Sequence, residues 1–256
     1  MPTIERWATF HPPVYDAARP WTLPPDTEDV TVVTDDGVHL HGWFAKAAPA
    51  APRTGVTVLF FHGNAQMLDT LTGTVALFQR NGFDFFAVDY RGYGKSEGRS
   101  RDETTLRLDG AAALRYLTQQ RGLAPGSIAL LGQSLGTVVA ADLAVSIPCR
   151  SLVLMAPLAS ARQQAAAVYP YLPAFLHHFM RSPLDTVGKI ASARCPVMVV
   201  HGDNDTVIDL AQGRAVYDAA RPPKKFILVP NGGHVPSLTR GGAHVADILS
   251  FLAKPE

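Results

Sequence analysis

Short apolar runs recur along this chain and alternate with longer stretches of mixed polarity. Residues 127–131, for example, are nearly all apolar, which is typical of a strand that is buried on both faces. The alternation of such strands with predicted helices favours an α/β fold, with a mainly parallel sheet covered by helices on both faces. The predicted strands are residues 30–34, 38–45, 56–61, 85–88, 127–131, 151–155, 196–200 and 225–229, and the predicted helices are residues 103–120, 137–144, 210–220 and 243–252.

The start of the chain departs from this alternation. Residues 1–28 are rich in proline and aromatic residues, so we expect an irregular arm that lies on the main domain. The strands predicted at 30–34 and 38–45 flank the turn sequence Asp-Asp-Gly, which indicates an antiparallel hairpin. Residues 29–256 are predicted to form a single domain, because 256 residues with 47% hydrophobic content are enough for one large core.

A serine lies in a turn between a predicted strand and a predicted helix. Residues 132–136, Gly-Gln-Ser-Leu-Gly, have the pattern of a nucleophile elbow, a strained turn that exposes the serine hydroxyl. Both glycines are required because a side chain at either position would collide with neighbouring backbone. We therefore interpret Ser134 as a nucleophile and expect the amide of Leu135, at the helix start, to stabilise an oxyanion.

Two later loops supply an acid and a base for this nucleophile. Asp205 follows the strand predicted at 196–200, and His234 lies in a Gly- and Pro-containing loop after the strand predicted at 225–229. Loops of this kind emerge at one edge of a parallel sheet, where ligands bind. The order serine, acid, histidine is also the order in which a nucleophile elbow is followed by its partners. We expect Ser134, Asp205 and His234 to form a catalytic triad.

Other residues compete for the roles of acid and base. Asp203 could be a turn residue, and Asp209 has the position of an N-cap for the helix that follows it. His244 lies within a predicted helix, and His201 is expected to hold the acid loop through hydrogen bonds. Asp205 is therefore the preferred acid, and His234 is the preferred base.

A second oxyanion donor is expected in the loop after the strand predicted at 56–61. His62 and Gly63 form a turn there that brings a backbone amide close to the nucleophile. The amide of Asn64 is the preferred donor, and that of Ala65 is the alternative. His62 itself is interpreted as a residue that braces the loop rather than one that takes part in catalysis.

With these features the chain resembles the α/β-hydrolase superfamily of serine hydrolases. The likeness is closest to the branch that includes the bud-emergence-type proteins and the animal protein depalmitoylases. The matching stretches are FHGNA at 61–65, DYRGYGKSEG at 89–98, GQSLGT at 132–137 and HGDNDTVID at 201–209. The resemblance implies an α/β-hydrolase fold with Ser134 as nucleophile, Asp205 as acid and His234 as base.

The stretch after the sixth strand is where the resemblance places a cap over the site. We expect a short helical cap at residues 159–185, too short for a large lid domain, and hence a fairly open site that accepts several small esters. Apolar residues at helical spacing are candidates for contact with an acyl chain, namely Phe175, Leu176, Phe179 and Met180. The alternative is a helix that packs the same apolar face on the core.

Composition and charge exclude several other kinds of protein. Lys and Arg number 23 and Asp and Glu 22, and no basic stripe is present, so nucleic acid is not an expected partner. No apolar run is long enough to cross a bilayer, and the first residues lack the pattern of a signal peptide, so we expect a cytoplasmic protein. Metal-binding motifs are absent, and we expect neither a metal nor another cofactor. Cys149 and Cys195 are interpreted as free buried thiols.

Three functions fit these features. The first is hydrolysis of a small-molecule carboxylic ester or thioester through an acyl-enzyme on Ser134, with His234 as base. The second is cofactor-free perhydrolysis or carbon–carbon bond hydrolysis by the same triad. The third, a catalytically inactive binding module, is disfavoured because all three triad residues are present. Neither the acyl-chain length nor the oligomeric state is predicted from the sequence.

Overall fold

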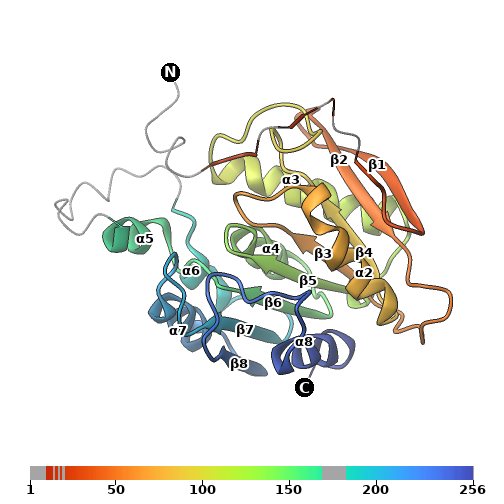
Figure 1. Cartoon of the computed structure of the whole chain (residues 1–256). Coiled ribbons are helices and arrows are strands. Elements are labelled where there is room, and N and C mark those ends of the chain that lie inside the picture. The colour runs from red at the N-terminus through yellow and green to blue at the C-terminus, as the bar shows by residue number, and fades with distance from the viewer. Residues whose placement is uncertain (1–9, 14, 17, 19–20, 169–182, 256) are drawn as a thin grey trace.

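The computed structural model describes residues 10–13, 15–16, 18, 21–168 and 183–255. Within these residues the strands form one sheet of eight, in the order β1-β2-β4-β3-β5-β6-β7-β8 (Figure 1). The strands are β1 (Thr27–Val33), β2 (His39–Ala45), β3 (Thr57–Phe61), β4 (Asp84–Val88), β5 (Ile128–Gln133), β6 (Ser151–Met155), β7 (Val197–Gly202) and β8 (Lys224–Val229). β2 is antiparallel to both β1 and β4, and all other pairs are parallel.

Helices cover both faces of this sheet (Figure 1). The α-helices of the described residues are α2 (Thr72–Arg80), α3 (Glu103–Arg115), α4 (Gly136–Ser146), α5 (Ala161–Val168), α6 (Thr186–Ile190), α7 (Leu210–Ala219) and α8 (Ala243–Ala253). Short helical turns are η1 (Leu68–Leu71), η2 (Tyr116–Gln120) and η3 (Pro125–Ser127). α3, α4, α6 and α7 contribute to the apolar core on one face, and α2 and α8 to the core on the other.

The central strands are apolar along their whole length because both of their faces are buried. In β5, Ile128 and Leu130 pack in the core under α4, whereas Ala129 and Leu131 pack in the opposite core. Successive side chains of a strand point to opposite faces, so a strand covered on both sides has no polar face. The α/β-hydrolase fold class predicted from the sequence is confirmed.

The predicted elements correspond to observed ones, with differences at their ends. β1 and β2 form the predicted hairpin, but β1 begins at Thr27, inside the predicted arm. The helix predicted at 103–120 is α-helical only as far as Arg115 and continues as the π-helix η2. Helices α2 and α6 were not predicted, since α6 is very short and α2 begins with Thr-Gly-Thr, residues of low helix propensity. The division into an arm, one domain and a cap stays a prediction.

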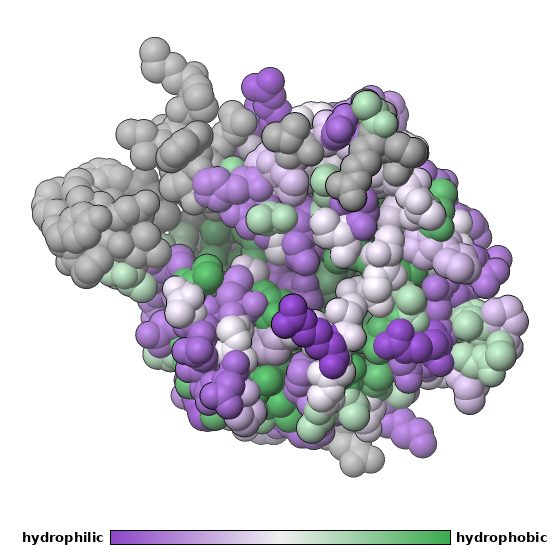
Figure 2. Space-filling view, in the orientation of Figure 1, coloured by the Kyte–Doolittle hydropathy of each residue, from purple (hydrophilic) through white to green (hydrophobic). Residues whose placement is uncertain are grey.

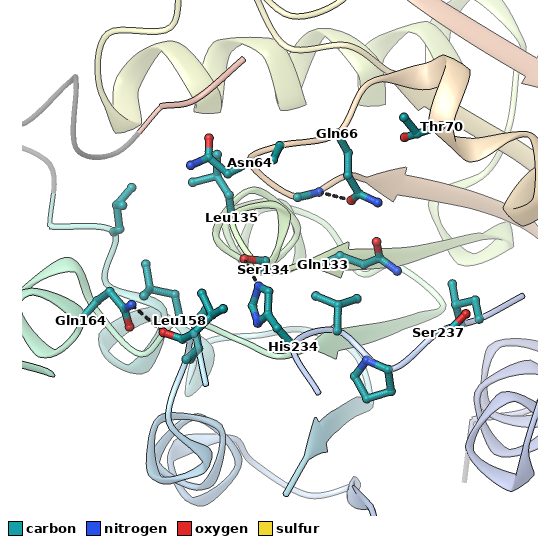
Figure 3. Close-up of a pocket in the computed structure, with 18 of the residues that line it drawn as sticks. Asn64, Gln66, Thr70, Gln133, Ser134, Leu135, Leu158, Gln164, His234 and Ser237 are labelled. Carbon is teal, nitrogen blue, oxygen red and sulfur yellow. Dashed lines mark hydrogen bonds between the residues drawn. The ribbon is translucent and has the colours of Figure 1, made fainter. Parts of the chain in front are cut away.

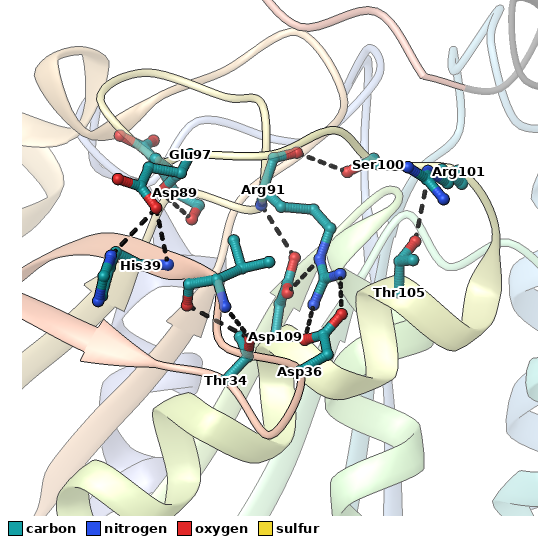
Figure 4. A network of polar contacts seen from close by, with 12 residues as sticks. Thr34, Asp36, His39, Asp89, Arg91, Glu97, Ser100, Arg101, Thr105 and Asp109 are labelled. Atoms are coloured by element: carbon teal, nitrogen blue, oxygen red, sulfur yellow. Dashed lines mark hydrogen bonds and ion pairs between the residues drawn. The ribbon is translucent and has the colours of Figure 1, made fainter.

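An ion-pair network with a buried centre at Arg91 and Asp109 joins α3 to the loop after β4 and, through the exposed Asp36, to the β1–β2 turn (Figure 4). Asp109 of α3 is fully buried and accepts hydrogen bonds from the backbone amide of Arg91 at 2.9 Å and from its Nε at 2.7 Å. The other guanidinium nitrogens of Arg91 donate to both carboxylate oxygens of Asp36, at 2.7 and 3.0 Å. Because a buried charge has to be paired, these contacts fix the hairpin against the helical layer.

Replacing Asp109 with Asn should lower the free energy of unfolding by about 3 kcal/mol, because Arg91 would keep its buried charge and lose its buried counter-charge. Urea denaturation monitored by circular dichroism measures this loss. The control is Asp35→Asn, which breaks an exposed ion pair with Arg115 and should cost less than about 1 kcal/mol. Equal losses in the two variants would contradict the assigned role of Asp109.

Candidate active site

β5 ends in a sharp turn that exposes Ser134. The φ angle of Ser134 is 50°, in the left-handed region that glycine favours. A Cβ atom at Gly136 would lie 2.1 Å from the carbonyl oxygen of Phe61, and one at Gly132 would lie 2.4 Å from the carbonyl oxygen of Gly136. The amide of Ser134 donates to the carbonyl of Met155 in β6 at 2.9 Å. The turn therefore has the geometry of a nucleophile elbow, held by the neighbouring strand.

Three side chains from three loops form a continuous chain of hydrogen bonds. Oγ of Ser134 lies 3.0 Å from Nε2 of His234 (Figure 3). Nδ1 of His234 lies 2.9 Å from Oδ2 of Asp205. With Asp205 ionised, Nδ1 carries a proton and donates it, which leaves Nε2 as an acceptor for the serine hydroxyl. The structure brings together the residues that the sequence analysis named as nucleophile, base and acid.

The carboxylate of Asp205 is surrounded by donors. Oδ1 accepts hydrogen bonds from the amides of Val207 at 2.8 Å and Ile208 at 2.9 Å, and Oδ2 also lies 3.3 Å from Nε2 of His201. Burial opposes ionisation, but the hydrogen bonds from His201, His234 and the two amides outweigh it and hold the pKa of Asp205 well below its usual range. Asp205 is therefore ionised through the neutral and weakly acidic range.

The competing residues have other partners. Asp209 caps α7, where its Oδ1 accepts a hydrogen bond from the amide of Ala211 at 2.7 Å. Asp203 is exposed and, in the described part of the chain, makes none of the contacts that Asp205 makes. Nε2 of His244 lies 3.1 Å from the carbonyl oxygen of Ser237. These positions agree with the choice, made from the sequence, of Asp205 as the candidate acid and His234 as the candidate base.

Two residues proposed to supply oxyanion donors, Leu135 and Asn64, line the cavity beside Ser134 (Figure 3). Leu135 directly precedes α4, and the first amides of a helix have no acceptor within it. The side-chain carbonyl of Asn64 accepts hydrogen bonds from the Tyr93 hydroxyl at 2.6 Å and from the backbone amide of His11 at 2.9 Å. Two distant segments thus hold the loop that carries Asn64.

His62 is buried beneath this loop. Its Nδ1 donates to the carbonyl of Gly63 at 2.8 Å, and its ring lies 4.4 Å from the ring of Tyr90, between centroids. The Tyr90 hydroxyl donates to the carbonyl of His62 at 2.9 Å. Burial lowers the pKa of His62 and so favours a neutral ring. These contacts fit a residue that braces the loop.

A cavity of about 750 Å³ opens at Ser134. Figure 3 shows Leu158 and Gln164 on one side of Ser134 and His234, and Gln66, Thr70, Gln133 and Ser237 on the other. In the orientation of Figure 1, Figure 2 shows hydrophobic residues in a hollow of this face, close to α4 and α6. The apolar side of the cavity consists of Leu158, Ala161, Ala165, Leu184, Val207 and Ile208. The more polar side consists of Gln66, Thr70, Thr74, Gln133, Ser237 and Thr239, and Val235, Pro236 and Leu238 of the same loop as Ser237 also line the cavity.

The polar side of the cavity was not predicted from the sequence. Its residues come from the loop after β3, from η1 and α2, from the end of β5 and from the loop after β8. Only Gln133 lay within a motif that the sequence analysis had used. The four residues proposed to contact an acyl chain, Phe175, Leu176, Phe179 and Met180, lie outside the described residues, so their role stays a prediction.

The described residues can be searched for membrane-spanning helices and for metal sites, neither of which is expected from the sequence. Within the described ranges, no helix combines the length and the apolarity needed to cross a bilayer. The same residues contain no group of three or more His, Cys, Asp and Glu side chains that could hold a metal ion. The cytoplasmic location and the lack of a cofactor stay predictions. Cys149 and Cys195 are both free, but only Cys149 is buried, whereas Cys195 is partly exposed.

A mostly parallel sheet, a serine on a left-handed turn after β5, and an aspartate–histidine pair on later loops together define an α/β-hydrolase. Comparison with known proteins agrees with this class, since residues 52–184 match the family described as serine aminopeptidase, S33. The chain belongs to this family, within the α/β-hydrolase superfamily of serine hydrolases, and is an enzyme of the hydrolase class.

Similar proteins span much of the chain. An uncharacterized protein of Mycobacterium tuberculosis is 34% identical over 231 residues, which are 90% of this chain and 80% of that protein. Alpha/beta hydrolase domain-containing protein 17C of Homo sapiens is 34% identical over 185 residues, 72% of this chain and 54% of that protein. The structure of the Pyrococcus furiosus esterase Pf2001 matches with a TM-score of 0.75 at 19% identity, covering 96% of this chain and 97% of the esterase, and supports the fold.

Replacing Asp205 with Asn should weaken the dependence of stability on acid pH. The folded-state pKa of Asp205 lies below its unfolded value of about 3.9, so its ionisation stabilises the fold above that pH. This contribution is lost as the pH falls from the unfolded pKa through the folded pKa. The free energy of unfolding, measured in urea at about pH 6 and about pH 3, should therefore fall less in the variant than in the wild type.

The matched control for this measurement is Asp203→Asn. Asp203 is exposed and lacks the hydrogen bonds of Asp205, so this variant should keep the wild-type difference between the two pH values. An unchanged pH dependence in Asp205→Asn would mean that its hydrogen bonds do not stabilise the carboxylate.

Proposed function

We propose that this enzyme hydrolyses carboxylic esters or thioesters through an acyl-enzyme formed on Ser134. The observation that carries the proposal is the hydrogen-bond chain from Asp205 through His234 to Ser134, with separations of 2.9 and 3.0 Å, at the wall of the cavity. A serine hydroxyl is a weak nucleophile unless a base within hydrogen-bond reach takes its proton during attack. His234 is in that position, and ionised Asp205 orients it.

In the acylation step, Ser134 Oγ attacks the carbonyl carbon of the substrate while Nε2 of His234 takes the serine proton. Asp205 stabilises the imidazolium that forms. The carbonyl electron pair moves to the oxygen, and the amides of Asn64 and Leu135 are the proposed donors to this oxyanion. When the tetrahedral intermediate collapses, the C–O or C–S bond breaks and His234 gives its proton to the departing oxygen or sulfur.

In the deacylation step, water takes the place of the leaving group. His234 removes a proton from the water as its oxygen attacks the acyl carbon, and a second tetrahedral intermediate forms on the same donors. Its collapse releases the carboxylic acid and returns the proton to Ser134. The two steps together consume one water molecule per bond and leave the enzyme unchanged.

The apolar side of the cavity suits the acyl half of such a substrate. Leu158, Leu184 and Ile208 are buried there, and burying an acyl chain against them gains about 0.8 kcal/mol per methylene. Solved structures of similar fold include two described as esterases, from Pyrococcus furiosus and Rhodothermus marinus. These likenesses support an ester as the substrate class.

Replacing Ser134 with Ala should lower kcat for p-nitrophenyl butyrate by on the order of 10⁴–10⁶-fold and leave the fold intact, because the nucleophile is lost. A fluorophosphonate probe should label the wild type at Ser134, as read by peptide mass spectrometry. Ser146→Ala is the control, since Ser146 lies at the far end of α4 and its hydroxyl bonds the carbonyl of Asp142. Normal turnover by folded Ser134→Ala protein would refute the mechanism.

Replacing Tyr93 with Phe should lower kcat about five-fold and leave KM nearly unchanged. The variant loses one hydrogen bond to Asn64, worth about 1 kcal/mol, and an oxyanion donor acts mainly in the transition state. Steady-state kinetics on p-nitrophenyl butyrate separate the two constants. Tyr217→Phe is the control, because Tyr217 packs on Phe226 in another part of the fold. A rise in KM alone would show that Tyr93 acts on substrate binding instead.

A further inference from the structure

We infer that the polar side of the cavity holds the leaving group and selects a neutral alcohol that carries further hydroxyls, so that the preferred substrates are acyl esters of an uncharged polyol. This inference rests on the proposed function and names the substrate class of the same site. Three features of the cavity support it: unused hydrogen-bonding groups, a lining without formal charges, and the placement of the two sides around Ser134 and His234.

Three side chains of the polar side have hydrogen-bonding groups without a protein partner among the described residues. Gln66 uses its carbonyl oxygen to accept from the amide of Gly63 at 2.8 Å, which leaves its NH₂ group unused. Thr74 is only 8% exposed, and its hydroxyl makes no hydrogen bond. Gln133 is 5% exposed; its NH₂ group lies 3.7 Å from the sulfur of Met155, and its carbonyl oxygen has no donor.

The apolar side shows the opposite arrangement. Gln164, which faces the cavity from α5, donates to the carbonyl of Val207 at 2.8 Å and accepts from the side chain of Gln212 at 2.7 Å. Its amide is therefore satisfied within the protein at both ends. The unused groups on the other side are not sealed from solvent, since none of them is among the buried side-chain atoms that lack a partner, so they are open to the cavity, where water or a polar ligand can pair with them.

The lining also restricts the charge of that ligand. None of the described residues that line the cavity is Asp, Glu, Lys or Arg. A charged leaving group would lose its hydration against these described residues without meeting a counter-charge among them. The unused groups are an NH₂ donor, a carbonyl acceptor and a hydroxyl that is both. An alcohol hydroxyl, which both donates and accepts, can pair with each of them.

The placement of the two sides assigns each half of the ester. The acyl chain gains most from the apolar side, next to Leu158. The leaving oxygen has to lie beside His234, which protonates it. Because Gln66 and Gln133 lie across Ser134 and His234 from Leu158 (Figure 3), the alcohol half then extends along the polar side. Its further hydroxyls would bond the unused groups of Gln66, Thr74 and Gln133.

Two esters that differ only in hydroxyls test the inference. Propyl butyrate and glyceryl 1-monobutyrate share the acyl chain and a three-carbon alkoxy group. Wild-type enzyme should hydrolyse the glyceryl ester with a kcat/KM at least about 10-fold higher, because a site built to bond hydroxyls disfavours the analogue that lacks them. Butyrylcholine, with a cationic leaving group, should be a poorer substrate than propyl butyrate.

Variants of one side chain link this preference to the polar side. Thr74→Val, which is nearly isosteric, should lower kcat/KM for the glyceryl ester about five-fold more than kcat/KM for propyl butyrate. Thr74→Ser keeps the hydroxyl and should keep the preference. Thr72→Val is the control, because Thr72 is exposed on the same helix and does not line the cavity.

The outcomes distinguish this inference from the proposed function. If the wild type cleaves propyl butyrate with the same kcat/KM as the glyceryl ester, the polyol subsite is wrong while ester hydrolysis stands. If no butyrate ester is cleaved and the fluorophosphonate does not label Ser134, the proposed function itself fails. If Thr74→Val lowers kcat/KM for both esters equally, or if its melting temperature shows that it does not fold, the variant Gln133→Met is measured instead. Loss of the preference for the glyceryl ester in Gln133→Met supports the polyol subsite, and retention of that preference overturns it.

Discussion

The left-handed backbone of Ser134 is the constraint on which the candidate active site depends. A non-glycine residue in this conformation costs on the order of 1–3 kcal/mol, so its surroundings have to hold it there. The sheet does this through the hydrogen bond from the amide of Ser134 to Met155 in β6. The start of α4 does it from the other side, because Thr137 donates to the carbonyl of Ser134 with its amide at 3.0 Å and with its hydroxyl at 2.6 Å. The doubly covered parallel sheet is therefore what presents the serine hydroxyl.

The way in which Asp205 is stabilised leaves its charge available to His234. Its other contacts are two backbone amides and His201, rather than a lysine or an arginine. Such donors favour the carboxylate without placing a fixed positive charge next to the imidazole. In the mechanism proposed above, a nearby cation would repel the imidazolium that forms when Ser134 attacks. The Arg91–Asp109 pair shows the contrasting use of charge in this fold, where the partners neutralise each other and hold elements together.

The strands and the convergence of Ser134, Asp205 and His234 could be predicted because each depends on local sequence. A central strand such as β5 is apolar whichever residues contact it, and Ser134, Asp205 and His234 each follow a strand, so the topology brings them to one edge. The polarity of the cavity could not be predicted in this way. Thr74 lies on α2, which has no motif, and its direction depends on how that helix packs. The role of Asn64 was inferred from its loop, but its contacts with Tyr93 and His11 come from segments whose approach no local pattern encodes.

An apolar side and a more polar side give the cavity a direction, and the proposed chemistry needs one. An ester can meet Ser134 with its carbonyl oxygen toward the amides of Asn64 and Leu135 only if its two halves extend in fixed directions. Reversing a polyol ester would place its hydroxyls against apolar side chains and leave the groups of Gln133 and Thr74 unpaired, and both changes cost free energy. In the free enzyme, water can satisfy those groups, so their cost in the absence of substrate is small. Under this proposal, the same unsatisfied groups that select the alcohol also align the scissile bond with the elbow, so substrate selection and orientation have one physical origin.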